Sequence, residues 1–166
     1  MKHTKLFKNL ISFLFYILCL GFLVILFYGP LGFNTIAQEN RDVQHWDFIS
    51  WLLLSISVIA YVFLIIGVKY LKNMAKEMTD LGSFDLAIQY NLRQSGKCLI
   101  ISSLLNYLTF ALIFIKRLVL DSELEVIFDN NILLQIILTI TGLFFIIQSD
   151  ILKLSNNLKT ENDLTI

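Results

Sequence analysis

The chain has 166 residues, of which 57% are hydrophobic and only 16% are charged. A soluble globular domain is about 45–50% apolar and about 25% charged, so the charged residues here are too few to cover a water-exposed surface. The 13 Lys and Arg residues balance the 13 Asp and Glu residues, and no direct nucleic-acid binding is expected from such a balance. One Pro and seven Gly argue against a turn-rich β protein and against a disordered chain. The composition indicates a small helical membrane protein.

Four uncharged apolar runs follow one another along the chain. At about 1.5 Å per residue each run is about 27 Å or longer as a helix, close to the ~30 Å hydrocarbon core of a bilayer. The runs lack the alternation of apolar and polar residues that is typical of barrel strands. The sequence therefore predicts an all-α, polytopic membrane protein, with one domain over residues 1–166 that forms a four-transmembrane-helix bundle. The spans are expected at residues 10–28, 48–68, 98–115 and 132–149.

The distribution of Lys and Arg predicts the orientation. Ten of the 13 cations lie before the first span, between the second and third spans, or after the fourth. Basic segments stay on the cytoplasmic side, so both termini are expected to be cytoplasmic, together with an inner hairpin over residues 69–97 and a tail over residues 150–166. The alternative for the first span is a cleaved signal peptide, because Thr35-Ile36-Ala37 resembles a cleavage site. Signal-peptide cores are about 7–15 residues long, shorter than this run, so retention is expected.

The two predicted outer loops contain only weak candidates for a functional site. The first outer loop, residues 29–47, contains His45 between Asp42 and Asp47, but one His with scattered carboxylates is a poor match to known metal sites. The second, after Lys116, is acidic and is expected to contain a short interfacial helix. No metal or other cofactor is expected.

The inner hairpin is more informative. Lys69, Lys72 and Lys76 recur at helical spacing on one face, and Gly82 and Ser83 are suited to ending one helix and capping the next. The cations, with Arg93, could attract anionic headgroups, hold the topology or form a docking surface. The last helix is expected to continue past Asp150 and to fray from Glu161 onwards. The candidate partner surface comprises Lys69, Lys72, Lys76, Arg93, Glu161, Asn162, Asp163 and Leu164.

The spans contain no ionisable side chain in their cores, and such groups are the usual mark of function inside a bilayer. The amides of Asn106 and Gln135 are the strongest polar candidates, because an amide is expected to reach another helix rather than fold back on its own. A polar substrate path is the alternative role for this pair. No nucleotide-binding, hydrolase or metalloprotease motif is present, so no enzyme is expected. Cys19 and Cys98 differ in depth, so no disulfide is expected.

The tail, Ile151 to Ile166, carries a resemblance. Its amphipathic stretch followed by Glu-Asn-Asp-Leu-Thr and an aliphatic residue resembles the C-terminus of a bacterial membrane family called domain of unknown function 2975. Ser83-Phe84, and Asn91-Leu92-Arg93 leading to Gly96-Lys97, are similar to the start of that family's third span. The resemblance implies four spans in a bacterial cytoplasmic (inner) membrane. The family has no established activity, but its genes often lie beside one for a Cro/CI-type helix-turn-helix regulator.

Two functions follow as expectations. The first is a non-enzymatic, regulatory or sensory membrane protein whose partners are the lipid bilayer and a cytoplasmic helix-turn-helix regulator. The second is a small oligomeric transporter, pore or immunity-type membrane protein, in which several copies would line a path because one copy has few polar groups.

Overall fold

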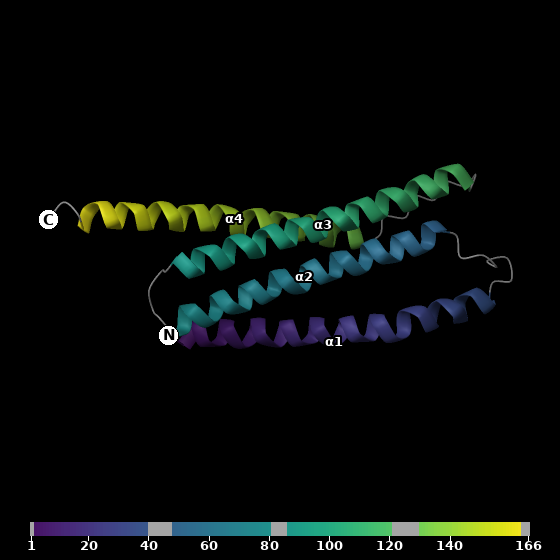
Figure 1. Cartoon of the computed structure of the whole chain (residues 1–166), viewed down its shortest axis with the longest axis horizontal. Helices are drawn as coiled ribbons and strands as arrows, with labels where there is room; N and C mark the ends of the chain where they lie inside the picture. Colours follow the sequence, from purple (N-terminus) through teal and green to yellow (C-terminus); the bar gives the residue numbers. More distant parts are fainter. Residues whose placement is uncertain (1, 40–47, 81–85, 121–129, 164–166) are drawn as a thin grey trace.

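The structure is a computed structural model that describes residues 2–39, 48–80, 86–120 and 130–163. These residues form four α-helices and no strand (Figure 1). All four helices are long and apolar enough to cross a membrane. The predicted all-α class with four spans is therefore confirmed, and it indicates a multi-pass membrane protein. The helices are α1 (Lys2–Glu39), α2 (Phe48–Asp80), α3 (Leu86–Leu120) and α4 (Asn130–Asp163).

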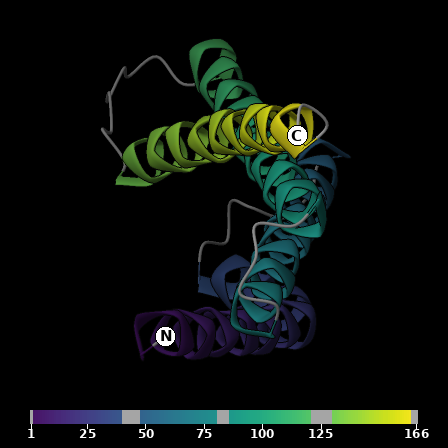
Figure 2. The same cartoon turned by 90° about the vertical axis from the view of Figure 1, so that its left-hand side faces the viewer.

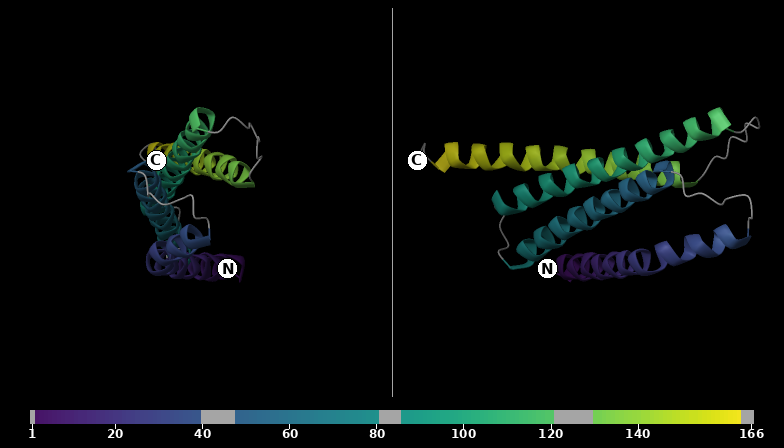
Figure 3. Two further views of the ribbon diagram at one scale, coloured as in Figure 1. Left: turned by 90° about the vertical axis from the view of Figure 1, so that its right-hand side faces the viewer. Right: turned by 45° about the vertical axis from the view of Figure 1, so that its right-hand side comes forward.

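The helices extend beyond the apolar runs that predicted them. The expected loop was wrong for residues 29–39, since α1 continues through Pro30 to Glu39. Proline lacks the N–H that would bond to a carbonyl one turn earlier, and Figure 3 shows α1 bending in its last third. Residues 116–120 likewise belong to α3 rather than to a loop. His45 and the acidic residues 121–129 lie outside the described residues.

The inner hairpin and the tail are helical, as predicted. The second helix continues past its apolar run to Asp80 and the third begins at Leu86, while Gly82 and Ser83 lie outside the described residues. The expectation of a tail helix is confirmed, but fraying from Glu161 was wrong, because α4 remains helical through Asp163.

The four helices form an open bundle. Close approaches between backbones join α1 to α2, α2 to α3 and α3 to α4, and no other pair within the described ranges. Figure 2, viewed along the long axis, shows this as a curved row from α1 to α4. Helix pairs in a membrane associate through packing and hydrogen bonds rather than through exclusion of water, so an open row is compatible with a lipid surrounding.

The contact between α3 and α4 is made by two glycines. A Cβ added to Gly96 would lie 2.6 Å from the carbonyl oxygen of Gly142, and one added to Gly142 would lie 2.9 Å from the carbonyl oxygen of Gly96. The two backbones therefore touch, as small residues allow in membrane helix pairs. Figure 2 shows that α4 crosses α3 at a marked angle.

This contact also staggers α4 along the row. Gly96 adjoins Lys97, at the edge of the third apolar run, whereas Gly142 lies in the middle of the fourth. At the end of its run Ser149 donates a hydrogen bond to the carbonyl of Gln89, about two turns, or about 12 Å, before Lys97. As a result α4 projects beyond the ends of α2 and α3 (Figure 1).

Candidate functional site

The cations of the inner hairpin lie at the end of the row where the chain begins. Figure 1 shows the start of α1, the end of α2 and the start of α3 at this end, with the C-terminal part of α4 extending past them. The side chains of Lys69, Lys76 and Arg93 are exposed. The predicted basic surface thus keeps three of its four cations exposed at the hairpin.

The fourth cation, Lys72, is directed onto α1. Its Nζ lies 4.7 Å from the ring centre of Phe15 and 4.6 Å from that of Tyr16. It also donates a hydrogen bond of 3.5 Å to the Tyr16 hydroxyl. A cation over aromatic rings is attracted to their negative faces, so Lys72 holds α2 against α1 rather than extending the basic surface.

The two arms of the hairpin are fastened to each other by a polar contact and an apolar cluster. The amide nitrogen of buried Asn91 donates to a carboxylate oxygen of Glu77 at 3.1 Å. Beside this contact, Met74 of α2 packs with Ile88 and Leu92 of α3. Neighbouring side chains add to this inner cluster: Leu71, Met78, Phe145 and Leu152. Since Phe145 and Leu152 belong to α4, side chains of three helices meet at this cluster.

The tail separates from this cluster after Leu152. Ile151, Leu154 and Leu158 recur at helical spacing and are more than half exposed. Glu161 is also exposed. Asn162 and Asp163 belong to α4, but their side chains, like Leu164 as a whole, lie outside what the structure describes.

The predicted partner surface is therefore two surfaces. Residues 152 to 161 of α4 extend about 14 Å along the helix axis, which carries the acidic end of the tail away from the inner cluster. The structure groups Lys69, Lys76 and Arg93 at the hairpin and leaves Glu161 apart from them. A partner that touches both has to be large enough to bridge this distance.

Within the spans, hydroxyl groups make the bonds between helices. The Ser102 hydroxyl donates to the carbonyl of Ala60 at 2.9 Å, and the Thr139 hydroxyl donates to Ser103 Oγ at 2.9 Å. At the other side of the row, the Tyr61 hydroxyl donates to the carbonyl of Leu18 at 3.1 Å. Each pair of neighbouring helices thus has at least one such bond within the apolar region.

Asn106 and Gln135 do not make the bonds expected of them. The Asn106 amide nitrogen donates to the carbonyl of Ser102, one turn earlier on its own helix, at 3.0 Å. The expectation that this amide would reach another helix was therefore wrong, because its short side chain finds an acceptor within α3. The buried Oε1 of Gln135 has no hydrogen-bond partner in the described part of the chain.

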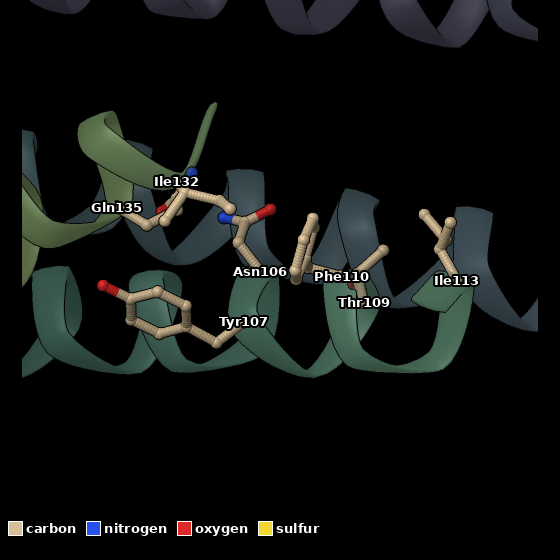
Figure 4. Close-up of a pocket in the computed structure, with 7 residues that line it drawn as sticks. All are labelled: Asn106, Tyr107, Thr109, Phe110, Ile113, Ile132 and Gln135. Carbon is tan, nitrogen blue, oxygen red and sulfur yellow. The ribbon is translucent and has the colours of Figure 1, made fainter. Parts of the chain in front are cut away.

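The structure nevertheless brings Asn106 and Gln135 to the same pocket between α3 and α4. The pocket has a volume of about 280 Å³. Figure 4 shows the carboxamide of Asn106 directed toward the side on which Ile132 and Gln135 lie. Five further residues line the pocket: Tyr107, Thr109, Phe110, Ile113 and Ile132.

These five residues were missed by the sequence analysis. Asn106, Tyr107, Phe110 and Ile113 recur at helical spacing, so the signal for a common face of α3 was present. The pocket ends where α4 starts, at Asn130. No pattern in the sequence predicts that starting position. Among the described residues no group of three His, Cys, Asp or Glu side chains is placed to hold a metal ion.

No protein-family model, no curated protein and no solved structure matches the chain.

Proposed function

We propose that this chain is a non-enzymatic protein of the bacterial inner membrane that acts through its inner surface, as the regulatory or sensory partner of a cytoplasmic helix-turn-helix regulator. The observation that carries the proposal is the projecting part of α4, where Ile151, Leu154 and Leu158 form an exposed apolar stripe. An amphipathic helix of this kind is recognised by a hydrophobic groove on a partner. The likeness of the tail to the family called domain of unknown function 2975 supports the same role.

The hairpin supports the proposal in a second way. Asn91, Glu77 and the inner cluster tie α2, α3 and α4 together at the point where the tail emerges. A partner bound to the tail would therefore act on a packed junction of three helices. Chains of packed side chains of this kind carry energetic coupling between distant sites.

Capture from native membranes tests this role. The tagged full chain is compared with a chain that lacks residues 161–166 and with the variant Leu154→Asn, Leu158→Asn. We expect the full chain to recover a helix-turn-helix protein, and both altered chains to recover at least tenfold less of it. Ser155→Ala, an exposed position on the same segment, is the control and should recover the normal amount. Identical partner lists for all four chains would contradict the proposal.

A second candidate function, a small oligomeric transporter or pore, rests on the polar pocket. Asn106 and Gln135 lie within apolar runs and line the same space. The test is solute or ion flux in proteoliposomes, which should vanish in the double variant Asn106→Leu, Gln135→Leu. Flux that persists in this variant would contradict a path at the pocket.

A further inference from the structure

The pocket between α3 and α4 has two chemically different parts. Four side chains provide polar groups, and Phe110 and Ile113 provide an apolar wall. The polar four are Asn106, Tyr107, Thr109 and Gln135. Both kinds of side chain lie within or beside the predicted spans. Apolar side chains with a small number of polar groups are the usual lining of a ligand site.

The pocket opens to the lipid side of the row. Phe110 is 40% exposed and Ile113 is 38% exposed, and both lie in the third apolar run. The helix α4 begins only at Asn130, whereas α3 continues to Leu120, so the pocket lies beside the part of α3 that α4 does not cover. This part is in the half of the spans away from the described termini (Figure 1). A ligand would therefore enter sideways from the bilayer.

One polar atom at the pocket, an unpaired acceptor, favours a hydrogen-bond donor on the ligand. The Thr109 hydroxyl donates to the carbonyl of Leu105 at 3.0 Å, and the Asn106 amide donates to that of Ser102. Each of these two side chains thus donates one hydrogen bond within α3. Within the described part of the chain the buried Gln135 Oε1 is left as an acceptor without a donor, and such a group is costly to leave unpaired in an apolar surrounding.

The lining excludes charge. None of the seven residues around the pocket is ionisable near neutral pH, and an ion at this depth would lack a counter-charge. The ligand is therefore uncharged. The volume of about 280 Å³ is just below the ~300–1,000 Å³ that is typical of ligand pockets, which suits a small head with a single chain.

We propose that this pocket binds an uncharged, single-chain amphiphile from the bilayer, whose hydroxyl donates to Gln135 Oε1 and whose chain lies over Phe110 and Ile113. The pocket shares no residue with the inner hairpin or the tail. A failure of this proposal would therefore leave the proposed regulatory role untouched, and the reverse also holds. The ligand is defined by two properties that the pocket selects: a hydrogen-bond donor and the absence of charge.

A photoreactive monoacylglycerol with a diazirine in its acyl chain is the probe. The full chain is reconstituted in phosphatidylcholine nanodiscs, whose lipid has no hydroxyl donor, and labelled residues are identified by mass spectrometry. We expect labelling of the α3 segment from Asn106 to Ile113. Unlabelled 1-oleoylglycerol should compete for this site, whereas methyl oleate, which lacks a donor, should not.

Three variants define the site. Gln135→Leu removes the acceptor and should lower labelling about tenfold, because the ligand hydroxyl is then buried without a partner. Ile113→Trp fills the opening at an exposed position, where folding is tolerant of the change, and should abolish labelling. Gln148→Leu makes the same chemical change on α4 outside the pocket and should leave labelling unaltered. The proposal is overturned if Gln135→Leu or Ile113→Trp is labelled like the unaltered chain, if methyl oleate competes equally, or if the label lies elsewhere.

Discussion

At the scale of single residues, two buried serines on α3 differ in one respect. Ser95 and Ser102 are 0% and 1% exposed, but among the described residues only the Ser102 hydroxyl finds an acceptor, the carbonyl of Ala60. Bonds between membrane helices are worth about 0.6 kcal/mol on average and up to about 1.7 kcal/mol. We expect Ser102→Ala to lower the free energy of unfolding by this amount. Unfolding in mixed detergent micelles measures it.

Ser95→Ala is the matched control. Its Oγ has no partner among the described residues, so the substitution removes an unsatisfied polar group, which is neutral or stabilising. A loss for Ser95→Ala as large as that for Ser102→Ala would show that burial alone, and not the bond to α2, determines the cost.

Gly21 of α1 and Tyr61 of α2 lie so close that substitutions at the two positions should be energetically coupled. A Cβ added to Gly21 would lie 2.7 Å from the Tyr61 hydroxyl oxygen, but 3.8 Å from the ring carbon that bears it. Gly21→Ala should therefore lose part of the ~1 kcal/mol that Ala gains in helix propensity while Tyr61 is present, because the Tyr61 hydroxyl has to move away from the carbonyl of Leu18.

The variant Tyr61→Phe removes the oxygen and should reduce that loss. A double-mutant cycle in the same unfolding assay gives the coupling energy. If the two changes add without interaction, the close approach of Gly21 to Tyr61 does not limit the packing of these helices.

At the scale of the helix pair, the two glycines determine how closely α3 and α4 approach. Gly96→Ala would place its Cβ against the backbone of α4, and backbone cannot move aside as a side chain can. We expect a loss of about 1–3 kcal/mol in the free energy of unfolding. A disulfide between Ser103→Cys and Thr139→Cys, formed with Cys19 and Cys98 changed to Ala, should also form more slowly in this variant.

Gly67→Ala is the control for this change. Its nearest contact would be 3.2 Å, to the Cβ of Cys98. Both substitutions gain the same helix propensity, about 1 kcal/mol. The difference between their free energies of unfolding therefore measures the cost of the contact between Gly96 and the backbone of α4. Equal stabilities for the two variants would contradict backbone contact at Gly96.

The elements also show what could be predicted from the sequence. Long uncharged runs predicted all four spans, since transfer of a charge into hydrocarbon dominates the energetics of insertion. The ends were less accurate, because α1 continues past Pro30 where the run ends. The pairing of Gly96 with Gly142 was out of reach, because hydropathy states that a segment inserts but not which neighbour it meets.

The sequence likewise predicted part of the candidate site in the spans, namely its residues but not their hydrogen bonds. Asn106 and Gln135 were chosen for their polarity and do line one pocket, yet neither makes the bond between helices that was expected. The hydroxyls of Ser102, Ser103 and Thr139 do so instead. A hydroxyl satisfies itself on its own helix or reaches another with equal ease, so sequence alone does not decide between the two.

At the scale of the whole molecule, both described ends of the chain lie at the same end of the row (Figure 1). An even number of spans requires this, and the excess of cations there predicts the cytoplasmic side. A fluorescent protein fused at either terminus should therefore fluoresce in a bacterial cell, and alkaline phosphatase at the same positions should be inactive. Active phosphatase at Ile166 would contradict the predicted orientation.

The stagger of α4 has a consequence for the membrane itself. The fourth apolar run is displaced by about 12 Å from the third, as the bond from Ser149 to Gln89 shows, so no flat bilayer of constant thickness matches both runs while Gly96 and Gly142 stay in contact. The mismatch is relieved by greater tilt of α4 or by local deformation of the bilayer, at a cost of fractions of a kcal/mol per Å. A change in the thickness of the surrounding membrane therefore changes the free energy of the contact between α3 and α4.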